Sequence, residues 1–204
     1  HLYNFTPLVN NCNHVGNNDE IEEKYFLFFG RLAKQKGIFT LIKAFAKLNS
    51  NFKLKILGTG PLEKKIKKHI LSKSIENIEL TGHKSGDELF EIIKKSYFTI
   101  VPSQWYENNP MTIIESYALG VPVIGSDVGG IPELINENNT GFLFEMGSSK
   151  KLKLKMSKAI NLSKKSYYLM KEKCLKYAEQ NFSKKIHLKK LMKLYNNTIE
   201  NYKK

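Results

Sequence analysis

The most informative stretch of the chain is YFTIVPSQWYENNPMTIIESYALGVPVIGS (97–126). It begins and ends with short apolar runs, 97–103 and 121–126, which have the length and composition of buried strands. Between these runs, Pro110 suits the first turn of a helix and Gly120 suits its end. A strand, a helix and a second strand in succession predict a βαβ unit with two parallel strands.

The same alternation extends over most of the chain. Four further runs are expected to be strands: YFLFFG (25–30), FKLKIL (52–57), NIELTG (77–82) and GFLF (141–144). Helices are expected over 36–48, 61–72, 87–95 and 110–119, and from 148 onward. Because the strands are continuous apolar runs, we expect helices on both faces of the sheet. The sequence therefore predicts an α/β fold: a Rossmann-like doubly wound parallel sheet of about six strands, with extra C-terminal helices.

The composition excludes several classes of protein. The 204 residues are 41% hydrophobic and 25% charged, which is typical of a globular chain with its own core. Cys12 and Cys174 allow no disulfide framework, and no Cys/His cluster has the spacing of a zinc site. No apolar run approaches the ~20 residues of a membrane span.

Charge is distributed very unevenly along the chain. The net charge is +14, and residues 150–204 alone hold 17 lysines against three glutamates. The first 149 residues are therefore balanced, which argues against a general polyanion-binding protein. We expect three segments: a linker or an ordered surface segment (1–24), a Rossmann-like ligand-binding domain (25–147) and Lys-rich C-terminal helices (148–204).

Polar residues and glycines gather where the predicted strands end. Arg31 and Lys36 follow the first strand, Gly82 and His83 end and follow the third, and Glu107 follows the fourth. The carboxyl ends of parallel strands share one edge, where open α/β sheets bind their ligands. This edge is expected to combine two cations and a carboxylate beside turns that contain glycine.

The predicted helix after the fourth strand adds a second feature to this edge. Asn109 is a good N-cap and Pro110 a good first helical residue. The amides from Met111 to Ile113 would then be free, and free amides at a helix N-terminus bind phosphate. Arg31 and Lys36 would supply the countercharges, and each such charged contact is worth roughly 1.5–3 kcal/mol. Together these groups predict a pocket for a phosphorylated ligand such as a nucleotide.

Four segments in register resemble the C-terminal, donor-binding domain of family 4 retaining glycosyltransferases, which have the GT-B fold. These segments are FGRLAKQKG (29–37), ILGTGP (56–61), VPSQWYENNPMTIIESYALGVPVIGSDVGGIPELI (101–135) and TGFLF (140–144). The strongest element is Glu107 with Glu115, spaced as the E-x7-E of that family, and Arg31 with Lys36 is the next. The resemblance implies that the chain is one half of a GT-B fold, with 25–147 as its nucleotide-sugar donor-binding domain.

The resemblance also implies a role for each matching residue. Glu107, Arg31 and Lys36 would be catalytic, and the two cations would also neutralise the donor diphosphate. Glu107 would face the hydroxyls of the donor sugar, and Glu115 would hold those of the ribose. The other donor-binding residues are expected to be Gly82, His83, Asn108, Asn109, Met111 and Thr112. Many members have x-F-G-L after the first Glu, whereas Asn108-Asn109-Pro110-Met111 stands here, so the donor sugar is not assigned.

The implied reaction is sugar transfer from a nucleotide-diphosphate sugar to an acceptor with retained anomeric configuration, in cell-envelope polysaccharide synthesis. No cofactor or metal is expected, and no D-x-D sequence occurs. The acceptor site would belong to an N-terminal domain that this chain lacks, so the chain alone is expected to transfer no sugar. The expected location is the cytoplasm, including the inner face of the membrane, where an anionic surface or a lipid-linked acceptor would be a partner. Nucleic acid is not expected as a partner.

Several residues allow other interpretations. A non-catalytic module that binds nucleotide sugars or polyphosphates would share the same pocket. Gly58-Thr59-Gly60 is expected to be a turn with an indirect role at the pocket. Gly129-Gly130 is expected to be a tight turn, either with or without a place in the pocket lining. Ser103 is expected to be a turn or cap residue, and Trp105 with Tyr106 packing residues. The Lys-rich end predicts an amphipathic helix packed on this domain or a missing one, an attachment to anionic lipid, or a nucleic-acid contact.

Overall fold

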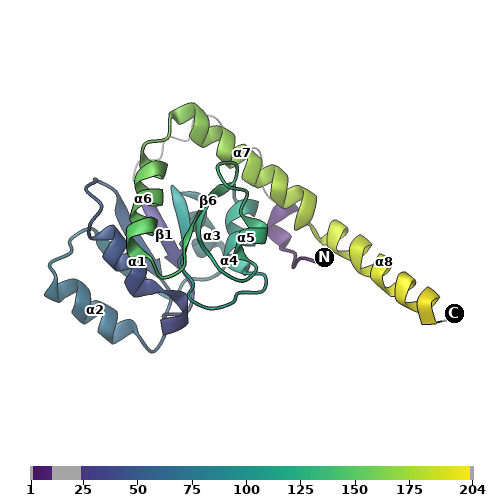
Figure 1. The fold of residues 1–204 in the computed structure, drawn as a ribbon, viewed down its shortest axis with the longest axis horizontal. Helices are drawn as coiled ribbons and strands as arrows, with labels where there is room; N and C mark the ends of the chain where they lie inside the picture. Colours follow the sequence, from purple (N-terminus) through teal and green to yellow (C-terminus); the bar gives the residue numbers. More distant parts are fainter. Residues whose placement is uncertain (1, 11–23, 203–204) are drawn as a thin grey trace.

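The computed structural model describes residues 2–10 and 24–202. Six parallel strands form one sheet in the order β3-β2-β1-β4-β5-β6 (Figure 1). The strands are Tyr25–Phe29 (β1), Lys53–Leu57 (β2), Ile78–Gly82 (β3), Phe98–Val101 (β4), Val123–Asp127 (β5) and Gly141–Glu145 (β6). The chain runs outward from β1 to β3, returns beside β1 with β4 and continues to β6. This is the predicted doubly wound sheet, and its strand order reverses between β1 and β4.

Helices connect the strands and continue beyond the sheet. The α-helices are Ile38–Phe45 (α1), Glu63–Ser72 (α2), Gly86–Lys94 (α3), Met111–Ala118 (α4), Ile131–Leu134 (α5), Ser149–Ile160 (α6), Lys164–Asn181 (α7) and Lys184–Tyr202 (α8). The 3-10 helices are Pro7–Asn10 (η1) and Lys34–Lys36 (η2). The first helix was predicted over 36–48, but Gly37 adopts a left-handed conformation with φ of 67° and separates η2 from α1.

Both faces of the sheet are buried, as the continuous apolar strands predict. On one face, Phe26 and Phe28 of β1 pack in a core with α1, α2 and α6. On the other, Leu27 and Phe29 pack with Ile93 of α3. A neighbouring cluster joins α4 and α5 to β4 and β5. Strand β1 is buried at every position and lies inside the sheet between β2 and β4. Its packing on both faces therefore fixes the position of its carboxyl end.

Helix α7 connects the two faces. Tyr167 and Met170 belong to the core of the first face, whereas Cys174 and Phe182 belong to the cluster around α4. The Tyr167 hydroxyl donates to the carbonyl of Tyr97 at 3.0 Å, and the two rings are stacked with centroids 4.2 Å apart. The Lys-rich region therefore contributes to the core that the strands form.

Helix α8 follows α7 and projects away from the rest of the structure (Figure 1). Its first part contacts the N-terminal segment, where His187 Nδ1 lies 2.8 Å from the carbonyl oxygen of Tyr3. None of its described residues is buried, and Leu188, Met192 and Tyr195 are each about half exposed. Across the described ranges, no helix combines the length and apolarity that a membrane span requires.

The predicted linker, 1–24, lies partly outside the described residues, which omit 11–23. The described part is attached to the domain, because the Thr6 amide donates to the carbonyl of Phe182 at 3.0 Å.

The packing of α7 generates a stability prediction. We expect Tyr167→Ala to lower the free energy of unfolding by about 3–5 kcal/mol, because it empties a buried aromatic site. Tyr167→Phe keeps the ring and loses one hydrogen bond, so we expect it to lower the free energy of unfolding by about 1 kcal/mol. Urea denaturation followed by circular dichroism measures both. If Tyr167→Ala lowered the free energy of unfolding by no more than Tyr167→Phe does, α7 would not be part of the core of the sheet.

Candidate functional site

The loops that follow β1 and β4 meet where the strand order reverses. The Gln104 amide donates to the carbonyl of Gln35 at 2.7 Å. A Cβ added to Gly37 would lie 1.8 Å from the carbonyl oxygen of Pro102, so only glycine permits this approach. The contact places the cations of the first loop beside the carboxylate of the second.

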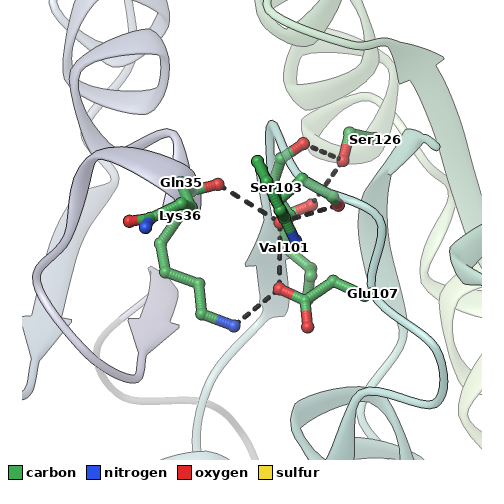
Figure 2. A network of polar contacts seen from close by, with 7 residues as sticks. Gln35, Lys36, Val101, Ser103, Glu107 and Ser126 are labelled. Carbon is green, nitrogen blue, oxygen red and sulfur yellow. Dashed lines mark hydrogen bonds and ion pairs between the residues drawn. The ribbon is translucent and has the colours of Figure 1, made fainter. Parts of the chain in front are cut away.

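Glu107 is held at this junction by charge and by hydrogen bonds. Its Oε1 atom lies 2.6 Å from Lys36 Nζ and accepts a hydrogen bond from Ser103 Oγ at 2.9 Å (Figure 2). The Ser126 hydroxyl of β5 donates to the carbonyl of Ser103 at 2.6 Å (Figure 2). The loops after β1 and β4, together with strand β5, thus fix one carboxylate, whose side chain is 19% exposed against 37% for Lys36.

The two glycines after β5 support the loop that carries Glu107. The Gly130 amide donates to the carbonyl of Glu107 at 2.6 Å. A Cβ on Gly130 would lie 2.0 Å from the carbonyl oxygen of Asn108, and one on Gly129 would lie 2.7 Å from that of Glu107. The predicted tight turn therefore also serves as a surface against which the neighbouring loop packs closely.

The turn after β2 supports the loop that carries Arg31. The Leu32 amide donates to the carbonyl of Thr59 at 2.8 Å, and the Leu62 amide donates to the carbonyl of Leu32 at 3.0 Å. The Gly58 amide donates to the carbonyl of Gly82 at 2.6 Å, which connects this turn to the end of β3. The turn predicted from Gly58-Thr59-Gly60 is present, and it joins three strand ends through the backbone.

Two adjoining cavities open at this edge of the sheet. The first has a volume of about 590 Å³, and its lining includes Arg31, Lys36, Trp105 and Glu107. The second has about 470 Å³ and is lined by residues after β1, β2 and β3, including Arg31, Thr59, His83 and Lys84. Arg31 belongs to both linings, so its side chain lies where the two cavities join. No ion pair of its guanidinium occurs within the described ranges, and the side chain remains exposed.

A larger hollow of about 760 Å³ lies between α1 and α2. Its lining includes Ser50, just before β2, and Asn77, just before β3. These positions are at the amino edge of the sheet, opposite to the site. None of the predicted site residues lines this hollow.

The N-terminus of α4 differs from its prediction by one residue. Pro110, with φ of −67° and ψ of 117°, occupies the N-cap position, and the helix begins at Met111. Asn109 is therefore not the N-cap, and Pro110 is not the first helical residue. The Ile113 amide was predicted to be free, but it donates to the carbonyl of Pro110 at 3.1 Å. The amides of Met111 and Thr112 have no acceptor in the described part of the chain.

Other predicted residues lie near the cavities without lining them. Neither lining includes Gly82, Asn108, Asn109, Met111, Thr112 or Glu115. Glu115 is half-buried on α4, and no group within 2–10 or 24–202 donates to its carboxylate. Burial raises the pKa of Glu115 above its ordinary value of 4.5. Glu107 is thus a paired carboxylate in a cavity lining, whereas Glu115 lies outside both linings and has no donor among the described residues.

Two features around the loop after β4 were missed or misinterpreted from the sequence: the serine support of Glu107 and the exposure of Trp105 and Tyr106. Ser103 and Ser126 form the support of Glu107, whereas Ser103 was expected to be only a turn or cap residue. Trp105 and Tyr106 were expected to pack, but they are 64% and 79% exposed. The signal available in the sequence was the position of Trp105, two residues before the first glutamate of the E-x7-E spacing.

The comparison with known families agrees with this geometry. The profile described as Glycosyl transferases group 1 matches residues 13–197. The chain belongs to this family. An uncharacterized glycosyltransferase of Methanocaldococcus jannaschii is 36% identical over 143 residues, which are 70% of this chain and 40% of that protein. The amylovoran biosynthesis glycosyltransferase AmsK of Erwinia amylovora is 31% identical over 135 residues, which are 62% of this chain and 33% of AmsK.

Solved glycosyltransferase structures share the fold. The Anabaena protein HepE, solved in complex with UDP, has a TM-score of 0.77 and 20% identity, covering 85% of this chain and 49% of HepE. The fold of this group 1 glycosyltransferase chain is therefore that of the C-terminal domain of a GT-B enzyme. The chain spans about 40% of the length of its Methanocaldococcus relative and about half of HepE.

No group of three His, Cys, Asp or Glu side chains that could hold a metal ion occurs among residues 2–10 and 24–202.

The unpaired carboxylate generates a prediction about stability. Burial raises the folded-state pKa of Glu115, so its contribution to stability is complete below about pH 4 and is lost as the pH rises through the folded-state pKa. We therefore expect Glu115→Gln to be more stable than the wild type at pH 7, with a smaller difference at pH 4. Urea denaturation at both pH values measures this change.

The matched control is Glu91→Gln on α3, whose side chain is 60% exposed. It should give no comparable gain at pH 7. If Glu115→Gln were less stable than the wild type at pH 7 and equal to it at pH 4, the ionised carboxylate would be stabilising, contrary to this account.

Proposed function

We propose that this group 1 glycosyltransferase chain is the donor-binding half of a family 4 enzyme that transfers a sugar from a nucleotide-diphosphate sugar with retention. The observation that carries the proposal is the position of Arg31. Its exposed guanidinium lies where two cavities join, one lined by His83 and the other by Glu107. A donor of this kind has a nucleoside at one end, a sugar at the other and a diphosphate between them.

The charges of the site support this orientation of the donor. The cavity at the end of β3 would take the nucleoside, with Gly82, His83 and Lys84 beside the base. Arg31 would neutralise the diphosphate, and the free amides of Met111 and Thr112 would add donors at the positive end of α4. The solved complex of HepE with UDP supports a nucleotide ligand for this fold. Asn108 and Asn109 would line the approach to these amides, and Glu115 would accept hydrogen bonds from the ribose hydroxyls.

Glu107 and Lys36 are proposed to act in the chemical step. Their side chains form an ion pair at 2.6 Å, and Ser103 donates a hydrogen bond to the same carboxylate oxygen. The second oxygen of Glu107 would accept hydrogen bonds from the donor sugar's hydroxyls. Arg31 and Lys36 would stabilise the charge that develops on the departing diphosphate, and preorganised groups of this kind are the largest contributors to many rate enhancements.

The biological setting is proposed from relatives and from the resemblance. AmsK is described as an amylovoran biosynthesis enzyme, which supports a role in cell-envelope polysaccharide synthesis. We propose a cytoplasmic protein that acts at the inner face of the membrane, with an N-terminal domain that supplies the acceptor site. No cofactor or bound metal is proposed.

Nucleotide binding tests the donor site. We expect one of UDP, GDP and ADP to bind in calorimetric titration with EDTA present. Arg31→Ala should weaken that binding by about 10- to 100-fold, which corresponds to the loss of one charged contact. Arg31→Lys keeps the charge and should lose less nucleotide affinity than Arg31→Ala. Lys47→Ala makes the same charge change beside the hollow between α1 and α2 and should bind as the wild type.

Two results would contradict the proposed donor site. One is an affinity that falls in Lys47→Ala and not in Arg31→Ala, which would locate the nucleotide between α1 and α2. The other is the absence of binding by all three nucleotides at millimolar concentration.

The division of the enzyme into two halves generates a separate prediction. The isolated chain should bind the donor and transfer no sugar, because the acceptor site is assigned to the absent domain. Chromatographic detection of transfer from the nucleotide sugar to added saccharide acceptors measures this. Steady turnover by the isolated chain would refute the assignment of the acceptor site.

A further inference from the structure

We propose that Trp105 is a specificity-determining residue of this site, on which the pyranose ring of the donor sugar stacks. The inference rests on the proposed function, because it assigns the sugar end of the same donor. It begins from the exposure of Trp105, whose side chain is 64% exposed although a large apolar ring gains free energy from burial. Within the described residues, no aromatic ring or cation contacts this indole.

The backbone on both sides of Trp105 is fixed. On one side, the Gln104 amide donates to Gln35, and the Gln104 side chain donates to Thr40 Oγ1 at 2.8 Å. On the other side, the carbonyl of Glu107 accepts from Gly130. The carbonyl of Trp105 itself lies 3.4 Å from Ser103 Oγ. The loop therefore presents the indole from a rigid backbone, which lowers the entropy cost of binding against it.

The surroundings of the ring match the chemistry of a sugar. Trp105 lines the cavity of about 590 Å³ together with Lys36, Glu107 and Arg31. A pyranose has an apolar face of C–H groups and an equator of hydroxyls. The indole provides an apolar surface for the face, and the carboxylate and cation provide hydrogen-bond partners for the hydroxyls. A nucleobase does not need an apolar surface combined with a carboxylate and a cation. The proposed place for the base is the separate cavity lined by His83.

The chain offers a matched control for Trp105. Tyr106 is adjacent, aromatic and 79% exposed, but it is not part of the cavity lining. Trp105 is also the only tryptophan of the chain, so the tryptophan emission of the protein reports on this residue alone.

Two measurements test the proposal on the full 204-residue chain. The first is calorimetric titration with UDP-glucose, GDP-mannose and ADP-glucose, each compared with its own nucleoside diphosphate. For the pair that binds, Trp105→Ala should weaken the nucleotide sugar about tenfold and leave the diphosphate within about twofold. Trp105→Phe should retain most of the affinity, and Tyr106→Ala should behave as the wild type.

The second measurement is quenching of the Trp105 emission by acrylamide. The nucleotide sugar should protect the emission from the quencher, and the diphosphate alone should not. Either of two results would overturn the proposal: Trp105→Ala binds the nucleotide sugar as tightly as the wild type, or the diphosphate alone protects the indole equally. In both cases nucleotide binding stands, so the proposed function survives. If no diphosphate or nucleotide sugar binds, the proposed function and this inference fail together.

Discussion

The site depends on the close approach of two backbone segments, at Gly37 and Pro102. A side chain at position 37 would overlap the carbonyl oxygen of Pro102, so glycine is required where the loops after β1 and β4 cross. The crossing lies where the strand order reverses, and there the two loops diverge from neighbouring strands. Because they touch at this point, Lys36 reaches Glu107 and the cavity beside them has a defined lining.

The other glycines at this edge extend the same constraint to the neighbouring strands. Gly58 and Gly60 allow the turn after β2 to contact the backbone at Gly30 and Leu32. Gly130 allows the turn after β5 to contact the loop that carries Glu107. Arg31, Lys36 and Glu107 thus stand on loops, but these loops are packed backbone against backbone. Such packing holds their charges in fixed positions.

The charged groups of the site differ in how they are prepared for a ligand. Glu107 pairs with Lys36 and accepts a hydrogen bond from Ser103, whereas Arg31 has no carboxylate beside it among the described residues. Glu115 is half-buried without a donor, and burial raises its pKa. In the proposed function, Arg31 would gain the diphosphate as a partner and Glu115 would gain the ribose hydroxyls.

The sequence predicted the sheet and its carboxyl edge because both follow from local patterns. Continuous apolar runs such as Tyr25–Phe29 and the glycines after them identify strands and their ends. Side-chain pairings across the edge do not follow from such patterns. The support of Glu107 by Ser103 and Ser126 arises only when β4 and β5 are adjacent. The predicted place of Pro110 in the helix was wrong by one residue. Proline fixes φ but leaves ψ free, so Pro110 can adopt the extended ψ of an N-cap.

The exposure of Trp105 was mispredicted for a related reason. Composition favours burial of an indole, and only the folded loop shows that the ring faces a cavity instead. Helix α8 shows the same limit. Its apolar residues predict that the helix packs against another surface, but the sequence does not say where that surface lies. In the structure helix α8 projects away from the rest of the described chain (Figure 1), and large apolar side chains such as Leu188, Met192 and Tyr195 are about half exposed.

The most direct test of the central claim is a crystal structure of the chain with the nucleotide sugar that binds it. The account predicts the base beside His83, the diphosphate at Arg31 and the sugar between Trp105 and Glu107. A nucleotide located in the hollow between α1 and α2, or a diphosphate that does not contact Arg31, would contradict it.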